Sequence, residues 1–249
     1  MTTRVMEWKS LKKFFKRLLI GLIIIGMIGG GVYLYFNTNL LRIQNVLFNE
    51  NPFVDLYDIQ RYSGVSIGTP YFEVDPVEAA NKLKTHPYIK DATAEKKFPG
   101  TIVFKVTYRE HFFNIRYSDI VLSMDDQLHV LEVLATENDG YTVEGFAFES
   151  FSTGKVIDVT QLYILENIVD LINLLKQSHL TPNPLIVFEN RNIVLTVETL
   201  HVKFGVGENI EDKFNAFVNI YEALKADGIT TGVIDVSSDG LPVYRPFGE

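Results

Sequence analysis

The chain has 249 residues, of which 47% are hydrophobic, so it is long enough for one large domain or two of ordinary size beyond its N-terminal segment. It contains no cysteine, which excludes a disulfide framework, thiolate catalysis and cysteine-ligated metals. Residues 1–17 carry six basic and one acidic side chain, and the remainder carries 17 basic and 30 acidic ones, a net charge of −13 that argues against binding to nucleic acid or anionic lipid headgroups.

Residues 18–36 form an uncharged stretch in which 11 of 19 residues are Leu, Ile, Val or Phe. As a helix this stretch would be about 28 Å long, close to the roughly 30 Å hydrocarbon core of a bilayer. Its apolar side chains give a gross insertion free energy of about −3 to −7 kcal/mol. Five glycines oppose the helix, but backbone in lipid has no other way to satisfy its hydrogen bonds. We therefore predict a transmembrane helix over 18–36.

Basic residues gather before this stretch, whereas the first basic residue after it is Arg42. By the positive-inside rule, residues 1–17 are a cytoplasmic tail and everything after Phe36 lies outside the cytoplasm. The residues that set this topology are Arg4, Lys9, Lys12, Lys13, Lys16 and Arg17. A cleavable signal peptide has the same order of basic and apolar segments, but no small-residue cleavage site follows here. We expect a retained, single-pass type II anchor.

The next residues predict a strand and two short helices. Leu41–Phe48 alternates imperfectly between apolar and polar residues, as in a strand. Asp55 is placed to cap a helix that ends at Gly64. Asp75-Pro76-Val77-Glu78 supplies a second helix with an N-cap, a proline at its first position and an early acidic residue. The inward face of this second helix is expected to carry Val77, Ala80 and Leu83.

Two strands are predicted next, over Tyr88–Phe98 and Thr101–Tyr108. Pro99-Gly100 between them has the residue order of a type II turn. In the second strand, Ile102, Phe104, Val106 and Tyr108 alternate with more polar residues, which predicts one buried face and one wet face.

This order of strand, helix, helix, strand and strand, with the runs His86–Ala92 and Phe98–Ile102, resembles a POTRA domain. A single anchor followed directly by one POTRA domain resembles the FtsQ/DivIB family of bacterial cell-division proteins. The resemblance implies an α+β fold with a transmembrane helix, a POTRA domain (βααββ) over 40–110, a second, β-rich domain with two helices over 111–244, and a C-terminal tail over 245–249.

The pattern of the second domain fits this resemblance. A hairpin is predicted at Asp125-Asp126, where the family more often has a glycine at the position of Gln127. A helix follows over Gln161–Gln177 and another after Asn209. Strands are predicted over Leu185–Phe188, Asn192–Val197 and His201–Phe204, the first two joined by Asn190-Arg191. The run His201–Gly205 followed by Lys213 resembles the family's strand, glycine and lysine-bearing helix.

Sequence patterns of catalysis are absent. The histidines at 86, 111, 129, 179 and 201 lack metal-ligand spacing and are expected at the surface or at edges, and no HExxH, GxSxG, SxxK or P-loop pattern occurs. The carboxylate pairs Asp125-Asp126 and Glu211-Asp212 lie in a predicted turn and a predicted first helical turn, where structural roles explain them. We expect a protein that is not an enzyme and has no cofactor or metal.

The C-terminal residues 233–244 indicate an edge strand, because Pro242 and Gly240 suit the border of a sheet. In the FtsQ/DivIB family the terminal strands bind the coiled-coil protein FtsB/DivIC, in complex with FtsL. Carried over by position, the resemblance implies a contact strip of Val236, Ser237, Ser238, Asp239, Gly240, Val243 and Tyr244. An ordinary hairpin turning at Asp239-Gly240, without a binding role, remains the alternative.

The resemblance implies a bitopic scaffold of the divisome, concentrated at the septum. There it would bind FtsB/DivIC-like and FtsL-like membrane proteins and regulate septal peptidoglycan synthesis with the synthase complex. A POTRA-bearing envelope protein that binds polypeptides by strand addition in transport or assembly is the alternative, although the alternating segments of a transmembrane barrel are missing. An envelope enzyme is a third possibility that would need an identifiable nucleophile or metal.

Overall fold

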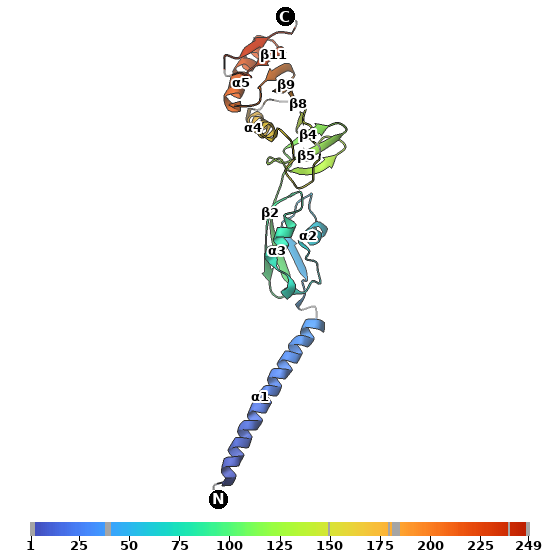
Figure 1. Cartoon of the computed structure of the whole chain (residues 1–249), viewed down its shortest axis with the longest axis vertical. Coiled ribbons are helices and arrows are strands. Elements are labelled where there is room, and N and C mark those ends of the chain that lie inside the picture. Colours follow the sequence, from blue (N-terminus) through green and yellow to red (C-terminus); the bar gives the residue numbers. More distant parts are fainter. Residues whose placement is uncertain are drawn as a thin grey trace. The chain divides into compact units, whose positions relative to one another are not determined.

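The computed structural model describes residues 3–37, 41–148, 150–178, 180, 185–238 and 240–247 (Figure 1). Compactness divides the chain into two units, of which the first holds residues 1–84 and 91–107 and the second holds residues 85–90 and 108–249. The architecture is the predicted α+β combination of an N-terminal apolar helix, a small domain and a larger β-rich region.

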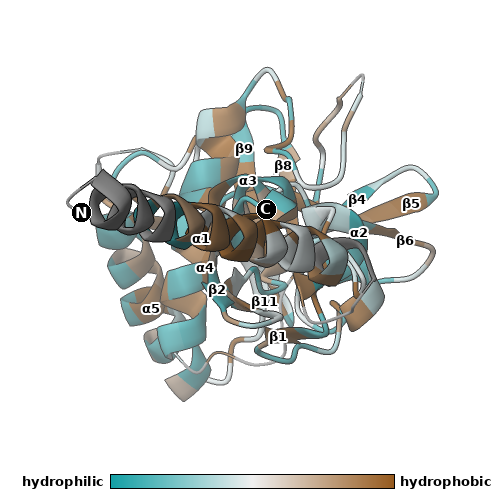
Figure 2. Ribbon diagram, turned by 90° about the horizontal axis from the view of Figure 1, so that it is seen from below, coloured by the Kyte–Doolittle hydropathy of each residue, from teal (hydrophilic) through white to brown (hydrophobic). Residues whose placement is uncertain are grey.

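The N-terminal helix α1 (Thr3–Asn37) contains the predicted span. Within it, Lys13–Leu34 is long and apolar enough to cross a membrane. Figure 2 shows the hydrophobic residues of α1 following one another along this part of the helix. All six basic residues assigned to topology lie on the same helix, and the side chains of Lys13, Lys16 and Arg17 are exposed.

The first unit contains a three-stranded sheet in the order β1-β3-β2. Its strands are β1 (Asn45–Phe48), β2 (Ile89–Lys97) and β3 (Thr101–Tyr108), and β1 runs parallel to β3. The helices are α2 (Leu56–Ser63), the short 3-10 helix η2 (Tyr71–Glu73) and α3 (Pro76–Leu83). The core includes Ile43, Ile59, Leu83, Ile102 and Phe104, each at most 1% exposed.

Local capping signals decide where α2 and α3 begin, as predicted. The Asp55 carboxylate accepts from the Asp58 amide at 2.8 Å, and Asp58 reciprocates in a capping box. Asp75 accepts from the amides of Val77 and Glu78, with Pro76 at the first helical position. Gly64 ends α2 with a φ of 73°, a left-handed conformation that glycine adopts easily.

Three local predictions for this unit are wrong. The first strand begins at Asn45 and not at Leu41, because the backbone of Ile43 bonds to Thr69 and Gly68 and not to β3. Val77 is 67% exposed, since the inward face of α3 is formed by Ala79, Ala80 and Leu83.

The turn at Pro99-Gly100 is also not type II. The Phe98–Pro99 peptide bond is cis, and Gly100 lacks the positive φ that a type II turn needs. Glycine is required there for a different reason, because an added Cβ would lie 2.4 Å from the Arg42 carbonyl oxygen.

The second unit is built on a nine-stranded sheet in the order β12-β11-β10-β9-β8-β7-β4-β5-β6. Neighbours pair antiparallel except β4–β7, β7–β8 and β10–β11, which are parallel. The strands are β4 (Phe113–Tyr117), β5 (Ile120–Met124), β6 (Val130–Leu134), β7 (Tyr141–Glu144), β8 (Leu185–Glu189), β9 (Asn192–Val197), β10 (Thr199–Lys203), β11 (Thr231–Asp235) and β12 (Val243–Arg245).

Two long helices connect the parallel strand pairs at the C-terminal half of this sheet. Helix α4 (Leu162–Ser178) links β7 to β8, and α5 (Ile210–Ala226) links β10 to β11. Buried residues of both helices join those of the strands in one hydrophobic core, which includes Leu165, Ile168, Phe204, Phe217 and Ile234. The short β8–β9 turn has positive φ at Asn190 and Arg191, as a type I′ hairpin requires.

Candidate partner-binding edge

Strand β12 lies at one border of the nine-stranded sheet. It pairs antiparallel with β11, with Ile234 opposite Tyr244 and Asp235 opposite Val243. No described strand pairs with its other side. Two apolar side chains are exposed at this border: Val243 is 42% exposed, and Leu241, just before the strand, is 89% exposed. An open strand edge of this kind can accept a strand from another chain.

Tyr244 and Gly232 fix β12 against β11. The Tyr244 hydroxyl donates to the Thr231 carbonyl oxygen at 2.8 Å. Gly232 has a φ of 137°, and a Cβ there would lie 2.6 Å from the Tyr244 ring and 2.7 Å from the Arg245 carbonyl oxygen. The close approach of these two strands therefore depends on a glycine at position 232.

The first two residues of the expected strip, Val236 and Ser237, directly follow β11 and are held by hydrogen bonds. Val236 is 3% exposed, and its amide donates to the Lys203 carbonyl oxygen at 2.9 Å. The Ser237 hydroxyl and amide both donate to the Asp235 carboxylate, at 2.6 and 3.0 Å. Burial acts to raise the pKa of Asp235, but these hydrogen bonds and the charges of Lys203 and Arg245 outweigh it and lower the pKa.

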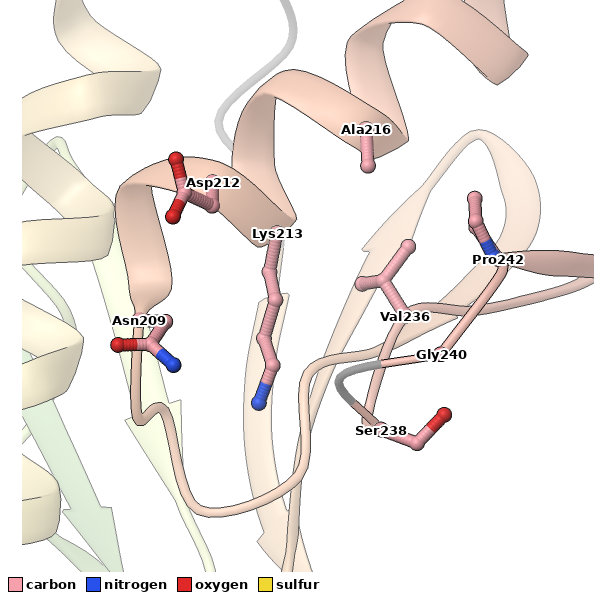
Figure 3. A pocket seen from close by; sticks show the side chains of 8 residues that line it. All are labelled: Asn209, Asp212, Lys213, Ala216, Val236, Ser238, Gly240 and Pro242. Atoms are coloured by element: carbon pink, nitrogen blue, oxygen red, sulfur yellow. The ribbon is translucent and has the colours of Figure 1, made fainter.

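A pocket of about 240 Å³ opens between the start of α5 and the segment that leads into β12 (Figure 3). The Lys213 side chain points into it, although the residue is only 7% exposed, and it forms no ion pair within the described ranges. Ser238 and Gly240 lie on the rim, and Asp239 lies outside the described residues. The pocket is lined by Asn209, Asp212, Lys213, Ala216, Val236, Ser238, Gly240 and Pro242.

The expected strip is thus divided by the structure into three parts. Val236 and Ser237 extend the pairing beyond β11, Ser238 and Gly240 border the pocket, and Val243 and Tyr244 belong to the edge strand. Sequence reasoning noted Lys213 only as part of a family pattern and missed that it faces this pocket. Its place at the fourth position of a helix, on the same face as Phe217, was the available signal.

The opposite border of the sheet is formed by β6, which pairs with β5. Val133 on this strand is 45% exposed, almost the same as Val243 on β12. The two borders thus offer comparable valines, and the pocket that Lys213 faces adjoins the β12 border. This pair provides a matched comparison of the two edges.

The carboxylate pairs singled out in the sequence have structural roles. Asp125 accepts from the amides of Gln127 and His129 at 2.9 and 2.7 Å, so its predicted role in the turn is confirmed. Glu211 and Asp212 lie in the first turn of α5, as predicted. No cluster of three or more metal-binding side chains occurs among the described residues.

The expectation that all histidines lie at the surface or at edges is wrong for His86. This residue is 8% exposed, and its Nδ1 accepts from the Tyr88 amide at 3.2 Å. His111 is half-buried, with Nδ1 2.9 Å from the Ser123 hydroxyl, and burial lowers its pKa. His179 lies outside the described residues.

The chain is similar in sequence to known cell-division proteins. The profile of the family described as "POTRA domain, FtsQ-type" matches residues 41–109. A protein named "Cell division protein DivIB" from Clostridium botulinum (strain Hall) is 23% identical over 250 residues, which cover 96% of this chain and 95% of the relative. Relatives of the same name are 24% identical over 216 residues in Clostridium tetani (84% of this chain, 79% of the relative) and 34% identical over 73 residues in Geobacillus kaustophilus (29% and 28%).

Proposed function

Because the chain belongs to the FtsQ/DivIB family of cell-division proteins, we propose that it is a bitopic scaffold of the divisome that acts by binding and not by turnover. Its partners are a small FtsB/DivIC-like coiled-coil membrane protein and an FtsL-like one. By holding them at the septum, the scaffold stabilises and regulates the septal peptidoglycan synthase complex.

The open edge of β12 is the observation that supports this proposal most directly. A partner strand added there would gain backbone hydrogen bonds from a row of groups that no described strand uses. Val243 would give it apolar contact on one face, and the pocket beside Lys213 would receive a side chain at its end. Binding of this kind needs no reaction chemistry.

We assign the contact strip as the resemblance implies it, with distinct tasks for its parts. Val243 and Tyr244 present the strand that is extended. Ser238 and Gly240 form the approach to the pocket, and Val236 and Ser237 hold that approach on β10 and β11. Asp239 is assigned to the strip by the resemblance alone. Changes at Val236 and Ser237 would then act through the position of the loop, whereas a change at Val243 would act on the partner directly.

A pair of edge variants tests the proposal. The full chain is co-purified from membranes with tagged DivIC-like and FtsL-like partners of the same organism, as the unaltered protein, as Val243→Lys and as Val133→Lys. Lysine on an exposed edge strand disfavours strand addition. We expect Val243→Lys to lose the partners and Val133→Lys, on the opposite border, to keep them. Retention by both variants would refute binding at β12.

Topology and location need separate tests, for which the absence of cysteine is convenient. Single cysteines at Thr3 and Ser152 would be treated in whole cells or protoplasts with a maleimide that cannot cross membranes. We expect labelling at position 152 alone, because the N-terminus is proposed to be cytoplasmic. A fluorescent fusion should form a ring at midcell, and uniform peripheral label would argue against a septal role.

A further inference from the structure

The small domain of the first unit exposes three large apolar side chains at one end. Ile67, Phe72 and Phe98 are 58%, 61% and 68% exposed. Phe72 and Phe98 both contact Tyr71, with ring centroids 5.5 and 6.0 Å apart, so they form one aromatic cluster around a buried tyrosine. We call Ile67, Phe72 and Phe98 the apolar tip.

The tip lies at the end where the chain enters the domain. The Ile43 amide donates to the Thr69 carbonyl oxygen at 2.8 Å, and the Ile43 carbonyl oxygen accepts from Gly68, next to Ile67, at 2.7 Å. The Gly100 carbonyl oxygen, two residues after Phe98, accepts from Gln44 at 2.7 Å. Both loops of the tip are therefore bonded directly to residues 43 and 44.

The length of the chain limits how far this end can be from the bilayer. Helix α1, with the candidate span Lys13–Leu34, ends at Asn37, and Leu41 is four residues further on. Four residues reach at most roughly 14 Å even when fully extended. The headgroup region of one leaflet is about 5–8 Å thick. Residues 41–44 and the loops bonded to them are thus held within reach of the interface, whatever the orientation of the domain.

Aromatic and large aliphatic side chains are the groups that favour this interface. Because the short connection between α1 and Leu41 joins the domain to the membrane helix, the apolar tip meets the membrane at a high effective concentration, so even weak insertion is favoured. Attraction to anionic lipid would not drive this contact, because the chain beyond residue 36 carries a net charge of −13. The tip is therefore suited to the interfacial layer of the membrane through apolar contact and not through attraction between charges.

We propose that the apolar tip inserts into the outer interface of the membrane that anchors the chain, and that this contact holds the small domain upright on the bilayer. Phe72 and Phe98 enter the headgroup layer, and Ile67 lies beside them. The proposal does not depend on the identity of the division partners or on binding at β12.

Site-specific fluorescence tests the insertion in the full-length chain. Ile67→Cys, Phe72→Cys and Phe98→Cys, each the only cysteine present, would be labelled with the environment-sensitive dye NBD and reconstituted in phosphatidylcholine vesicles. The matched control is Phe53→Cys, because Phe53 is equally apolar, 55% exposed and follows β1 at its other end. The Asn49 side chain bonds there to the Val106 carbonyl oxygen at 2.8 Å, far along β3 from Gly100.

We expect dye at positions 72 and 98 to emit at shorter wavelength than at position 53. Lipids with a nitroxide near the headgroup should quench it more strongly than lipids with a nitroxide near the chain end. The difference should persist at high salt, since the contact is apolar. Equal emission and quenching at positions 53, 72 and 98 would overturn the proposal.

A second measurement separates insertion from mere proximity. Dye at Ile67→Cys would be compared in the native background and with Phe72→Ser and Phe98→Ser together. Both phenylalanines are exposed, so their replacement leaves the core intact, as circular dichroism would verify. Loss of quenching at position 67 supports insertion by the aromatic pair, and unchanged quenching would show that the tether alone brings this end to the lipid, against the proposal.

Discussion

The Arg109 guanidinium lies 2.6 Å from the Asp125 carboxylate in the second unit, and the two side chains are only 11% and 2% exposed. Arg109 Nη1 is also 3.0 Å from His129 Nδ1. The other Asp125 oxygen is occupied by the amides of Gln127 and His129. A single carboxylate thus holds the β5–β6 turn together and neutralises a buried cation.

Asp125→Ala should destabilise the second unit by about 3–5 kcal/mol, because it leaves the guanidinium buried without its counter-charge and frees two turn amides. Urea unfolding followed by the near-ultraviolet dichroism of the tyrosines would measure it, since Trp8, the only tryptophan, lies in α1. The neighbouring Asp126→Ala is the control and should change stability little, because Asp126 is exposed. Similar losses in both variants would contradict the role given to Asp125.

A pH dependence is expected from His111. Burial, the largest cause, and the nearby Lys176 charge lower its pKa below 6.5, so the folded state binds the proton less readily than the unfolded state. Its contribution to stability is therefore fully present above about pH 6.5 and is lost as the pH falls from there toward the folded-state pKa. The melting temperature should drop between pH 7.5 and pH 5.5.

The variant His111→Gln isolates this effect. Glutamine does not titrate, so the drop in melting temperature over the same pH range should be smaller than in the unaltered chain. The Asp235 carboxyl does not interfere, because its pKa is lowered and its contribution is lost only below about pH 4. An equal drop in both proteins would assign the pH dependence to other groups.

The contact between Gly232 and Tyr244 leads to a third prediction. Gly232→Ala should displace β12, because its Cβ would lie 2.6 Å from the Tyr244 ring in a backbone conformation unfavourable to alanine. Amides of β12 should then exchange with deuterium faster, and binding to the DivIC-like partner should weaken. Gly228→Ala is the control, because Gly228 also has positive φ but nothing within 4 Å of an added Cβ. It should leave β12 unchanged.

Features set by neighbouring residues were predictable from the sequence. Asp55, Asp75 and Gly64 determine helix ends within a few residues, and Asn190-Arg191 determines a hairpin, since each acts on backbone groups close in the chain. The long apolar helix that could cross a membrane was predictable for the same reason, because its composition is a local property.

Features that depend on distant residues were not predictable in this way. Strand β7 was missed, since its place between β4 and β8 is set by parallel pairing with residues about 28 and 43 positions away. The start of β1 was misplaced because Ile43 finds its partners in the Gly68–Thr69 loop. The Lys213 pocket likewise follows from the whole sheet order. The position of β12 at the border, in contrast, was predicted from Gly240 and Pro242 and is confirmed.

The cap of α3 provides a last prediction, confined to the first unit. Asp75 accepts from the amides of Val77 and Glu78 at 2.8 and 3.3 Å, and Pro76 already lacks an amide hydrogen. Asp75→Ala leaves these two donors to water and should destabilise the unit by about 0.5–2 kcal/mol. Asp75→Ser, which restores a capping oxygen, should recover most of the loss. Hydrogen exchange of α3 would measure both, with the amides of α4 as an internal reference that should not change. Equal exchange in the alanine and serine variants would mean that the proline and the packing of Leu83, and not the cap, hold the start of this helix.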